Sequence, residues 1–245
     1  MLVKGENMIS VCIATYNGAR FIRKQLESIL PQLGEKDEVV VSDDGSVDGT
    51  VSAVESLHDS RIRVVTGPKK GTPVLNFEHA LKEAKGDYIF LSDQDDVWMP
   101  EKVDVMMRYL EKYDCVCSDC EVVYTDQDEN ILHKNPSFYA YNNTRQGVLY
   151  NLFLKNGYLG CCMAFNRKVL KKALPFPVEC PMHDIWLGNI SACYYSMKFV
   201  PEKLIIFHRH NSNASTTGRP SAYTLYGKIR LRLVVAMALM KRLLK

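Results

Sequence analysis

Hydrophobic and polar positions along the first hundred residues predict strands that alternate with helices. Short β-branched runs at 9–14, 38–41, 61–65 and 88–91 have the length of buried strands. Between them, apolar residues recur every three or four positions, as in amphipathic helices, and Pro31 ends the first of these helices. This alternation is typical of βαβ units, so we expect an α/β fold with a mostly parallel central sheet.

Polar segments follow three of these predicted strands directly. They occupy residues 15–18, 42–50 and 92–96. Ligands of open α/β sheets bind outside the carboxyl ends of the strands. We therefore expect the three segments to meet in one site.

The pattern changes beyond residue 101. A helix, a strand at 115–124, a polar stretch at 125–146 and a mixed α and β region lead to about residue 208. No linker rich in Pro, Gly or Ser separates the two halves. We expect one domain over residues 1–218 and a distinct tail over 219–245.

The tail predicts a basic amphipathic helix. From Tyr223 to Lys245 it contains six basic residues and no acidic residue. Its apolar stretch, 233–240, is much shorter than the roughly 20 residues that span a bilayer. Two interpretations remain open: the helix lies on an anionic membrane surface, or it packs on the domain or a partner and carries a basic face.

Composition narrows the class of protein further. With 47% hydrophobic and 24% charged residues over 245 positions, the chain is neither disordered nor fibrous. A formal net charge of +3 makes no case for a nucleic-acid partner, and we expect none. The first eight residues lack the apolar core of a signal peptide, and the eight cysteines have no disulfide-scaffold spacing. These features favour a cytoplasmic location.

The segment 92–96, with the sequence SDQDD, places three carboxylates within four residues. Carboxylates this close repel each other unless a cation or hydrogen-bond donors neutralise them. Oxygen ligands at this density suit Mg²⁺ or Mn²⁺, which would hold the phosphates of a nucleotide. The alternative is a solvated acidic turn that caps the helix starting near Pro100.

The segment 42–50 combines a glycine turn with a predicted helix start. A structural turn explains Gly45, Gly49 and Thr50. It does not explain the successive carboxylates of Asp43 and Asp44, which could accept hydrogen bonds from a base or a ribose. Taken alone, the segment reads as structural.

The three polar segments together resemble glycosyltransferase family 2. The resemblance rests on IATYNG at 13–18, VSDDGSVDGT at 41–50 and LSDQDDVW at 91–98. The last of these is similar to the branch of bacterial rhamnosyltransferases and related surface-polysaccharide transferases. The resemblance to the family continues through GCCMAFN at 160–166, HDIW at 183–186 and HRHNSN at 208–213. It therefore covers residues 8 to about 215.

This resemblance implies the A-type glycosyltransferase (GT-A) fold and a nucleotide-diphosphate sugar as donor. Residues 8–100 would form the nucleotide-sugar half and 101–218 the acceptor half. Mn²⁺ or Mg²⁺ would bridge the diphosphate, held by Asp95, Asp93 and His210. The implied nucleotide-binding residues are Thr15, Tyr16, Asn17, Asp43, Asp44, Asn76 and Asp93.

Within that set, the resemblance makes Asp43 the acceptor of the base imide, with Asp44 behind it. Three positions depart from the branch pattern. Leu75 stands where the pattern often has Arg, a role that Lys69 or Lys70 could take. Phe207 and His208 stand where it usually has Tyr and Arg, so His208 could take part of the role of that arginine.

By the same resemblance, Asp184 in the segment HDIW is the general base of an inverting transfer. Such a base deprotonates the acceptor hydroxyl on the face opposite the leaving group. From the local sequence alone, Asp184 would instead be the N-cap of a helix. The implied sugar or acceptor contacts are Asp96, Trp98, Cys162, His183, Trp186 and His208.

Purely structural roles are the alternative for several of these residues. Trp98 and Trp186, the only tryptophans, could stack on a sugar or pack in the core. Cys162 is most simply a buried thiol. A zinc site of Cys115, Cys117, Cys120 and His133 is disfavoured, because the spacing is not that of a structural zinc site and 115 and 117 fit one face of a strand.

The sequence therefore predicts an inverting, metal-dependent hexosyl- or deoxyhexosyltransferase. It would move sugar from a UDP- or dTDP-sugar to a glycan or undecaprenyl-linked acceptor in capsule or O-antigen-type synthesis. The tail would hold it at the inner face of the cell membrane. The alternatives are a nucleotidyltransferase acting on sugar phosphates and a non-catalytic nucleotide-sugar-binding module.

Overall fold

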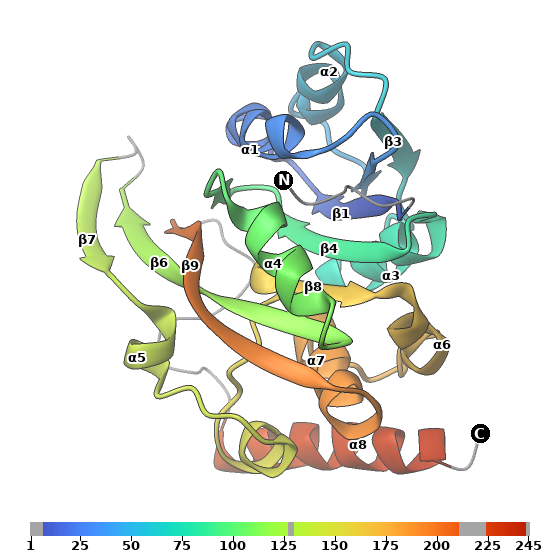
Figure 1. Cartoon of the computed structure of the whole chain (residues 1–245), viewed down its shortest axis with the longest axis vertical. Coiled ribbons are helices and arrows are strands. Elements are labelled where there is room, and N and C mark those ends of the chain that lie inside the picture. The colour runs from blue at the N-terminus through green and yellow to red at the C-terminus, as the bar shows by residue number, and fades with distance from the viewer. Residues whose placement is uncertain (1–6, 127–129, 211–223, 244–245) are drawn as a thin grey trace.

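The computed structural model describes residues 7–126, 130–210 and 224–243. Within them, one sheet contains nine strands in the order β3-β2-β1-β4-β8-β6-β9-β5, and β7 pairs with β6 at the side (Figure 1). The strands are β1 (Ile9–Thr15), β2 (Glu38–Asp43), β3 (Ile62–Thr66), β4 (Tyr88–Asp93), β5 (Val97–Trp98), β6 (Cys115–Thr125), β7 (Ile131–Asn135), β8 (Met163–Asn166) and β9 (Met197–Arg209).

Helices cover the sheet and connect its strands. They are α1 (Ile22–Ile29), α2 (Thr50–Glu55), α3 (Pro73–Glu83), α4 (Lys102–Leu110), α5 (Phe138–Asn142), α6 (Leu170–Ala173), α7 (His183–Tyr194) and α8 (Leu225–Leu243). Short helical turns are η1 (Leu30–Gln32), η2 (Tyr150–Leu154), η3 (Gly160–Cys162) and η4 (Arg167–Val169).

The first half of the sheet is parallel, as the sequence predicts. Strands β3, β2, β1 and β4 run in the same direction, and β1 and β2 are almost entirely buried. Burial on both faces explains why these strands read as continuous apolar runs. The register pairs Thr15 with Asp43 and Ala14 with Asp93, so the three polar segments do meet at one edge of the sheet.

The second half of the sheet is mixed. Strand β8 is antiparallel to both β4 and β6, whereas β6 and β9 are parallel to each other. The α/β class and the GT-A-like architecture are confirmed. The stretch 125–146 differs from expectation, because it contains β7 and α5. Four of the five β7 residues are exposed, so no apolar alternation marks this strand in the sequence.

The C-terminal helix α8 lies along one end of the molecule, far from α1 and α2 (Figure 1). It packs against α7 and η2, with Val235 and Leu239 buried. The inner face of α8 therefore packs on the domain, which is one of the two interpretations left open by the sequence. None of the described helices has the length and apolar content needed to cross a membrane. The expected boundary at 218/219 and the segment 211–213 lie outside the described residues.

Candidate active site

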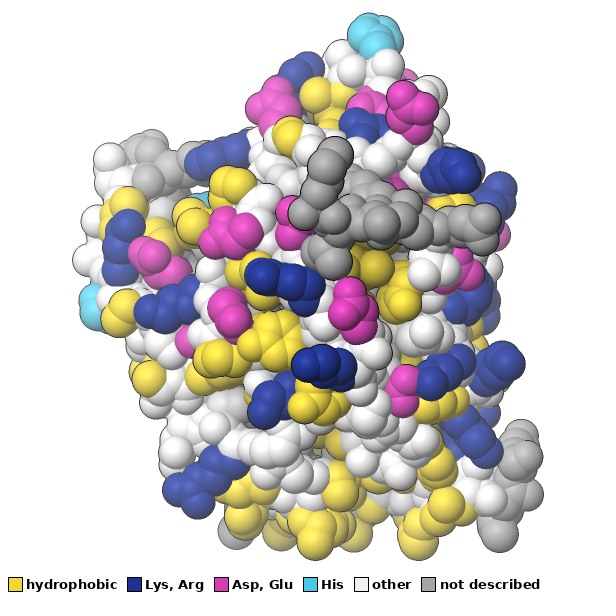
Figure 2. All heavy atoms as spheres, viewed as in Figure 1, with side chains coloured by type: hydrophobic (Ala, Val, Ile, Leu, Met, Phe, Trp, Pro, Cys, Tyr) yellow, Lys and Arg dark blue, Asp and Glu magenta, His cyan; other side chains and the backbone are white. Residues whose placement is uncertain are grey.

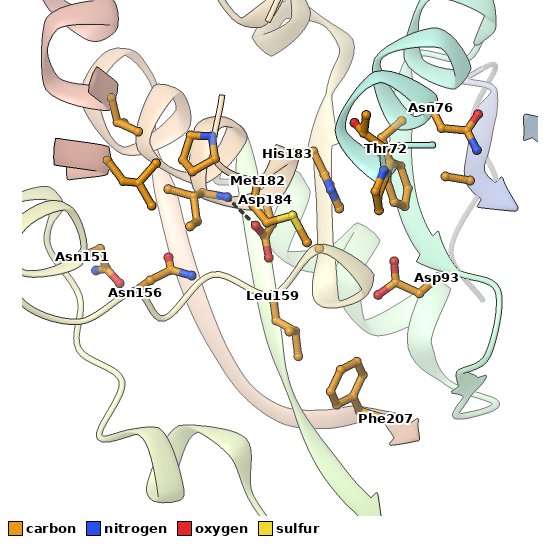
Figure 3. Close-up of a pocket in the computed structure, with 18 of the residues that line it drawn as sticks. Thr72, Asn76, Asp93, Asn151, Asn156, Leu159, Met182, His183, Asp184 and Phe207 are labelled. Atoms are coloured by element: carbon orange, nitrogen blue, oxygen red, sulfur yellow. Dashed lines mark hydrogen bonds between the residues drawn. The ribbon is translucent and has the colours of Figure 1, made fainter. Parts of the chain in front are cut away.

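An elongated cavity of about 760 Å³ begins at the carboxyl edge of β1, β2 and β4 and reaches α8. Figure 3 shows Asp184 between Asp93 on one side and Asn151 and Asn156 on the other. Eight of the predicted site residues line it: Thr15, Tyr16, Asp44, Asn76, Asp93, Asp95, His183 and Asp184.

At the sheet end, the two neighbouring carboxylates Asp43 and Asp44 have different surroundings. The Asp43 carboxylate accepts hydrogen bonds from the backbone N–H groups of Gly45 (3.1 Å) and Ser46 (2.9 Å) and from Thr15 Oγ1 (3.1 Å). It is occupied in shaping the turn and does not line the cavity. Asp44 does line the cavity. Asp44 follows the end of β2, and its carboxylate also accepts from the backbone N–H groups of Gly71 (2.7 Å) and Lys70 (3.3 Å).

Polar side chains hold the loops of this end in place. Asn76 donates to the carbonyl oxygens of Thr15 (3.1 Å) and Ser42 (3.0 Å), which ties the ends of β1 and β2 together. Gln94 bonds the backbone of Tyr16 in both directions, at 3.0 and 3.2 Å. Asn17 accepts from the backbone N–H of the neighbouring loop at 3.0 Å and is not part of the cavity wall.

The acidic segment after β4 is an electrostatically strained cluster. Burial and the carboxylates of Asp95 and Asp184 raise the pKa of Asp93 to about 8. Asp95 Oδ2 lies 2.9 Å from His210 Nε2, although the two residues are 115 positions apart. Pairing of β5 with β9 brings them together, because it carries the end of β9 past the 92–96 loop.

The carboxylates of residues 93–96 fit a divalent cation. Ligand atoms of Asp93, Asp96 and Cys161 lie within 4.8 Å of one another, and the buried Oδ2 of Asp96 has no hydrogen-bond partner among the described residues. Burial raises the pKa of the Cys161 thiol, which makes it a poor ligand for a hard cation. The carboxylates of Asp93, Asp95 and Asp96 offer the oxygen donors that Mg²⁺ or Mn²⁺ prefers, and the imidazole of His210 lies beside Asp95.

Asp184 lies in the first turn of α7, in the middle of the cavity. Its side chain is 8% exposed, and Oδ1 accepts from the backbone N–H of Ile185 at 2.7 Å. Burial raises the pKa of Asp184 to about 6, against backbone hydrogen bonds that lower it. The N-cap position belongs to Met182, so the capping alternative does not describe Asp184. A carboxylate that is ionised at neutral pH and protonates near pH 6 is suited to accept a proton.

The neighbouring His183 is a neutral imidazole. It stacks on Phe77 at 3.9 Å between ring centroids, and neither ring nitrogen has a hydrogen-bond partner among the described residues. Burial lowers the pKa of His183 to about 3. A Cβ at position 160 would lie 2.5 Å from His183 Nε2, so only glycine fits there. His183 therefore presents unused hydrogen-bonding capacity beside Asp184.

Comparison with known proteins identifies the family. The family model "Glycosyl transferase family 2" matches residues 10–174, about two thirds of the chain. This chain belongs to glycosyl transferase family 2. The resemblance of the three polar segments to that family is thus confirmed.

Relatives and solved structures agree with this assignment. The chain is 28% identical over 193 residues to UDP-Glc:alpha-D-GlcNAc-diphosphoundecaprenol beta-1,3-glucosyltransferase WfgD of Escherichia coli, covering 76% of this chain and 73% of WfgD. It is 24% identical over 235 residues to dTDP-rhamnosyl transferase RfbG of Shigella flexneri, covering 89% and 78%. The fold is similar to TarS of S. aureus, solved in complex with UDP-GlcNAc: TM-score 0.67, 19% identity, 94% of this chain and 66% of the solved one.

Both tryptophans of this family 2 domain lie away from the cavity. Trp98 is 2% exposed and donates from Nε1 to Ser92 Oγ at 2.9 Å. Trp186 is fully buried and donates to the carbonyl oxygen of Ala173 at 2.8 Å. Their polar atoms are satisfied inside the core, so the packing alternative describes both, in place of the expected contact with sugar.

Three further residues that we expected to contact the sugar, Asp96, Cys162 and His208, do not line the cavity of this family 2 domain. Cys162 is fully buried and does not line the cavity. The Asp96 carboxylate accepts from the backbone N–H of His208 at 3.1 Å, and His208 Nδ1 lies 3.0 Å from the carbonyl oxygen of Asp95. Asp96 and His208 thereby join the 92–96 loop to β9.

Some residues in the cavity wall, and the buried Lys102 near it, could not be found from the sequence. Lys102 is completely buried, donates to the carbonyl oxygen of Cys161 at 2.6 Å and lies 4.1 Å above the Trp98 ring. Burial lowers the pKa of Lys102 to about 8. A lysine at a helix start normally reads as a surface residue. At the far end of the cavity, the lining residues that the sequence did not indicate are Asn151, Lys155, Asn156, Lys228 and Arg232.

The disfavoured zinc site is not assembled in the described residues. Cys115, Cys117 and Cys120 are buried on β6, whereas His133 is exposed on β7 and contacts the Tyr124 ring at 5.7 Å. The alternation of 115 and 117 along a strand explains the cysteine spacing.

Proposed function

We propose that this family 2 domain is an inverting, metal-dependent glycosyltransferase. It transfers a hexosyl or deoxyhexosyl group from a UDP- or dTDP-sugar to an undecaprenyl-linked saccharide, in the assembly of a bacterial capsule or O-antigen-type polysaccharide. The observation that carries the proposal is the position of Asp184. Its carboxylate, with a pKa raised to about 6, lies between the acidic cluster and the far end of the cavity.

Asp93, Asp95 and His210 would hold Mn²⁺ or Mg²⁺ at the sheet end. When bound, the cation stabilises the negative charge of the departing diphosphate, so no protein acid is needed there. Asp44 and the 15–16 backbone line the same end and would contact the nucleoside. These contacts orient the donor so that its anomeric carbon faces Asp184.

Asp184 then acts on the acceptor. Its carboxylate takes the proton of the acceptor hydroxyl, and the oxygen forms a bond to the anomeric carbon. The bond from that carbon to the diphosphate oxygen breaks, and its electron pair leaves on the nucleoside diphosphate. Attack from the face opposite the leaving group inverts the configuration. His183, neutral and unpartnered among the described residues, would orient the acceptor hydroxyl.

The names of two relatives support the choice of substrates. WfgD is named for a UDP-glucose donor and a diphosphoundecaprenol acceptor, and RfbG for a dTDP-rhamnosyl donor. The cavity extends on both sides of Asp184, where a donor and an acceptor would bind.

The outer face of α8 supports docking on an anionic membrane. Five large apolar side chains at helical spacing are 46% to 77% exposed: Tyr226, Ile229, Leu233, Met237 and Met240. Figure 2 shows hydrophobic side chains along the end of the molecule where α8 lies in Figure 1. Arg230 and Lys241 are exposed on the same helix, which contains no acidic residue. An exposed apolar stripe with flanking cations is the pattern of a helix that lies in a membrane interface.

The test is a product analysis with purified protein, a panel of UDP- and dTDP-sugars, and Mn²⁺ or EDTA. We expect Mn²⁺-dependent release of one nucleoside diphosphate, accelerated by lipid-linked saccharides from bacterial membranes. A nucleotidyltransferase would instead consume nucleoside triphosphate and sugar phosphate. Thermal stabilisation by a nucleotide sugar without any product would favour the binding module. Either result would contradict the proposal.

A further inference from the structure

The far end of the cavity is basic. Three cationic residues, Lys155, Lys228 and Arg232, line it there, whereas the acidic lining residues belong to the sheet end and to Asp184. Lys228 and Arg232 lie one turn apart on α8, and both are partly withdrawn from solvent. Neither forms a salt bridge with an acidic side chain of the described ranges 7–126, 130–210 and 224–243.

Four of the five cations of α8 form two groups, and the fifth, Arg242, donates to the carbonyl oxygen of Pro175. Arg230 and Lys241 are exposed, and Arg230 pairs with Glu179 at 2.8 Å. Lys228 and Arg232 face the cavity instead, and Arg232 Nη2 donates to the carbonyl oxygen of Leu154 at 2.6 Å, which fixes its direction. Withdrawing cations from water without a carboxylate partner is unfavourable, so this end of the cavity favours an anionic ligand.

The donor does not supply that anion. The donor diphosphate belongs, in the proposed function, to the acidic cluster at the opposite end, where a cation would neutralise it. The basic end instead adjoins α8 and η2. Exposed apolar side chains there are Leu154 of η2, Leu149 directly before η2 and Leu233 of α8. A ligand that binds there would carry its negative charge at the boundary between the cavity and an apolar surface.

We propose, on the basis of the proposed function, that Lys155, Lys228 and Arg232 bind the diphosphate of a polyprenyl-linked acceptor. The guanidinium of Arg232 offers a planar pair of donors and Lys228 a compact charge, a combination suited to phosphate oxygens. The acceptor sugar then extends toward Asp184, and the polyprenyl chain leaves the cavity at the apolar stripe of α8. The three cations would therefore select acceptors by their diphosphate and set the distance from lipid to sugar.

The direct test is binding of geranyl diphosphate, a soluble polyprenyl diphosphate, measured by calorimetry in EDTA so that no metal contributes. The wild type is compared with Lys228→Gln/Arg232→Gln, with the charge-preserving Lys228→Arg/Arg232→Lys, and with Lys241→Gln, an exposed position of α8 outside the cavity. We expect the Kd to rise at least tenfold in the neutral double variant and to change less than twofold in Lys241→Gln. The charge-preserving variant should retain most of the affinity.

Competitors identify the source of the bound phosphate. Inorganic diphosphate should displace geranyl diphosphate, whereas geraniol and dihexanoyl phosphatidylglycerol should not. Unchanged affinity in the neutral double variant would overturn the proposal, as would equal displacement by phosphatidylglycerol, which would make this a lipid-headgroup site. Equal unfolding midpoints for the variants exclude a folding defect, and the charge-preserving variant tests the proposal if the neutral one does not fold.

The same proteins separate this inference from the proposed function. Nucleotide binding and Mn²⁺-dependent donor hydrolysis should be unchanged in the neutral double variant, because those steps use the opposite end of the cavity. If the neutral double variant loses geranyl diphosphate binding but the wild type turns over no nucleotide sugar, the result would support the site and contradict the transferase. Transfer with unaltered acceptor KM in the neutral double variant would support the transferase and contradict the site.

Discussion

Replacement of Asp184 by Asn should make the free protein more stable while it removes transfer. Burial raises the pKa of Asp184 from 3.8 to about 6, above the value in the unfolded chain. The folded protein thus favours the protonated carboxyl. Stability that this group contributes is complete below pH 4 and is lost as the pH rises through 6. A pKa difference of about 2 means that the wild type loses about 3 kcal/mol of unfolding free energy once the pH is well above 6.

Asparagine avoids this loss because it is neutral at every pH and its amide oxygen can still accept from the N–H of Ile185. Asp184→Asn should therefore exceed the wild type in unfolding free energy by up to about 3 kcal/mol at pH 8 and by about 1.5 kcal/mol at pH 5. Below pH 4 the two proteins should converge. At pH 8 the midpoint should rise by roughly 6–12 °C for a domain of this size. Transfer should fall by about two to four orders of magnitude with the loss of the base.

The assay combines denaturant unfolding at pH 8 and pH 5 with nucleotide release in the presence of Mn²⁺. Asp104→Asn is the matched control, because Asp104 also lies in the first turn of a helix, α4, but is exposed. It should gain no stability and should retain activity. A stability difference for Asp184→Asn that does not depend on pH would refute the argument from burial. Transfer at the wild-type rate would refute its role as base.

Three further outcomes test other parts of the molecule. His210→Ala should abolish the Mn²⁺-dependent rise in the unfolding midpoint with UDP or dTDP. In the wild type, ligand at 100 times its Kd should add about 2.7 kcal/mol to the unfolding free energy. Trp98→Phe, which loses the bond to Ser92, should lower the unfolding free energy by about 1–2 kcal/mol and leave the donor KM within twofold. Leu233→Ser/Met237→Ser should reduce co-sedimentation with anionic vesicles without changing the unfolding midpoint, because both side chains are exposed.

Local patterns were sufficient for the first hundred residues of the fold. Buried parallel strands read as apolar runs, and their ends are marked by the first polar residues, so the meeting of Thr15, Asp43 and Asp93 at one edge could be predicted. The family resemblance then named the carboxylates and His210. The region beyond residue 101 was less predictable, because an exposed strand such as β7 is held by backbone pairing to β6 and leaves no hydrophobic signal.

The direction of each side chain was beyond prediction. Consecutive carboxylates look alike in a sequence, yet Asp44 lines the cavity while Asp43 bonds its own turn. The same holds for the tryptophans, whose indoles are equally able to stack on a sugar or to fill a core. Lys102 is buried where its ammonium group donates to the carbonyl oxygen of Cys161, 59 residues further along the chain.

Chain-local chemistry accounts for the strand-and-helix order, the strand-end loops and the residue types of the site, because hydrophobic periodicity and turn propensity act over a few residues. Long-range packing accounts for the contact between His210 and Asp95, the raised pKa of Asp184 and the inward direction of Lys228 and Arg232. Burial, distance and electrostatic coupling depend on segments that only the folded chain brings together. For that reason the carboxylates could be recognised in the sequence, whereas the basic end of the cavity became visible only in three dimensions.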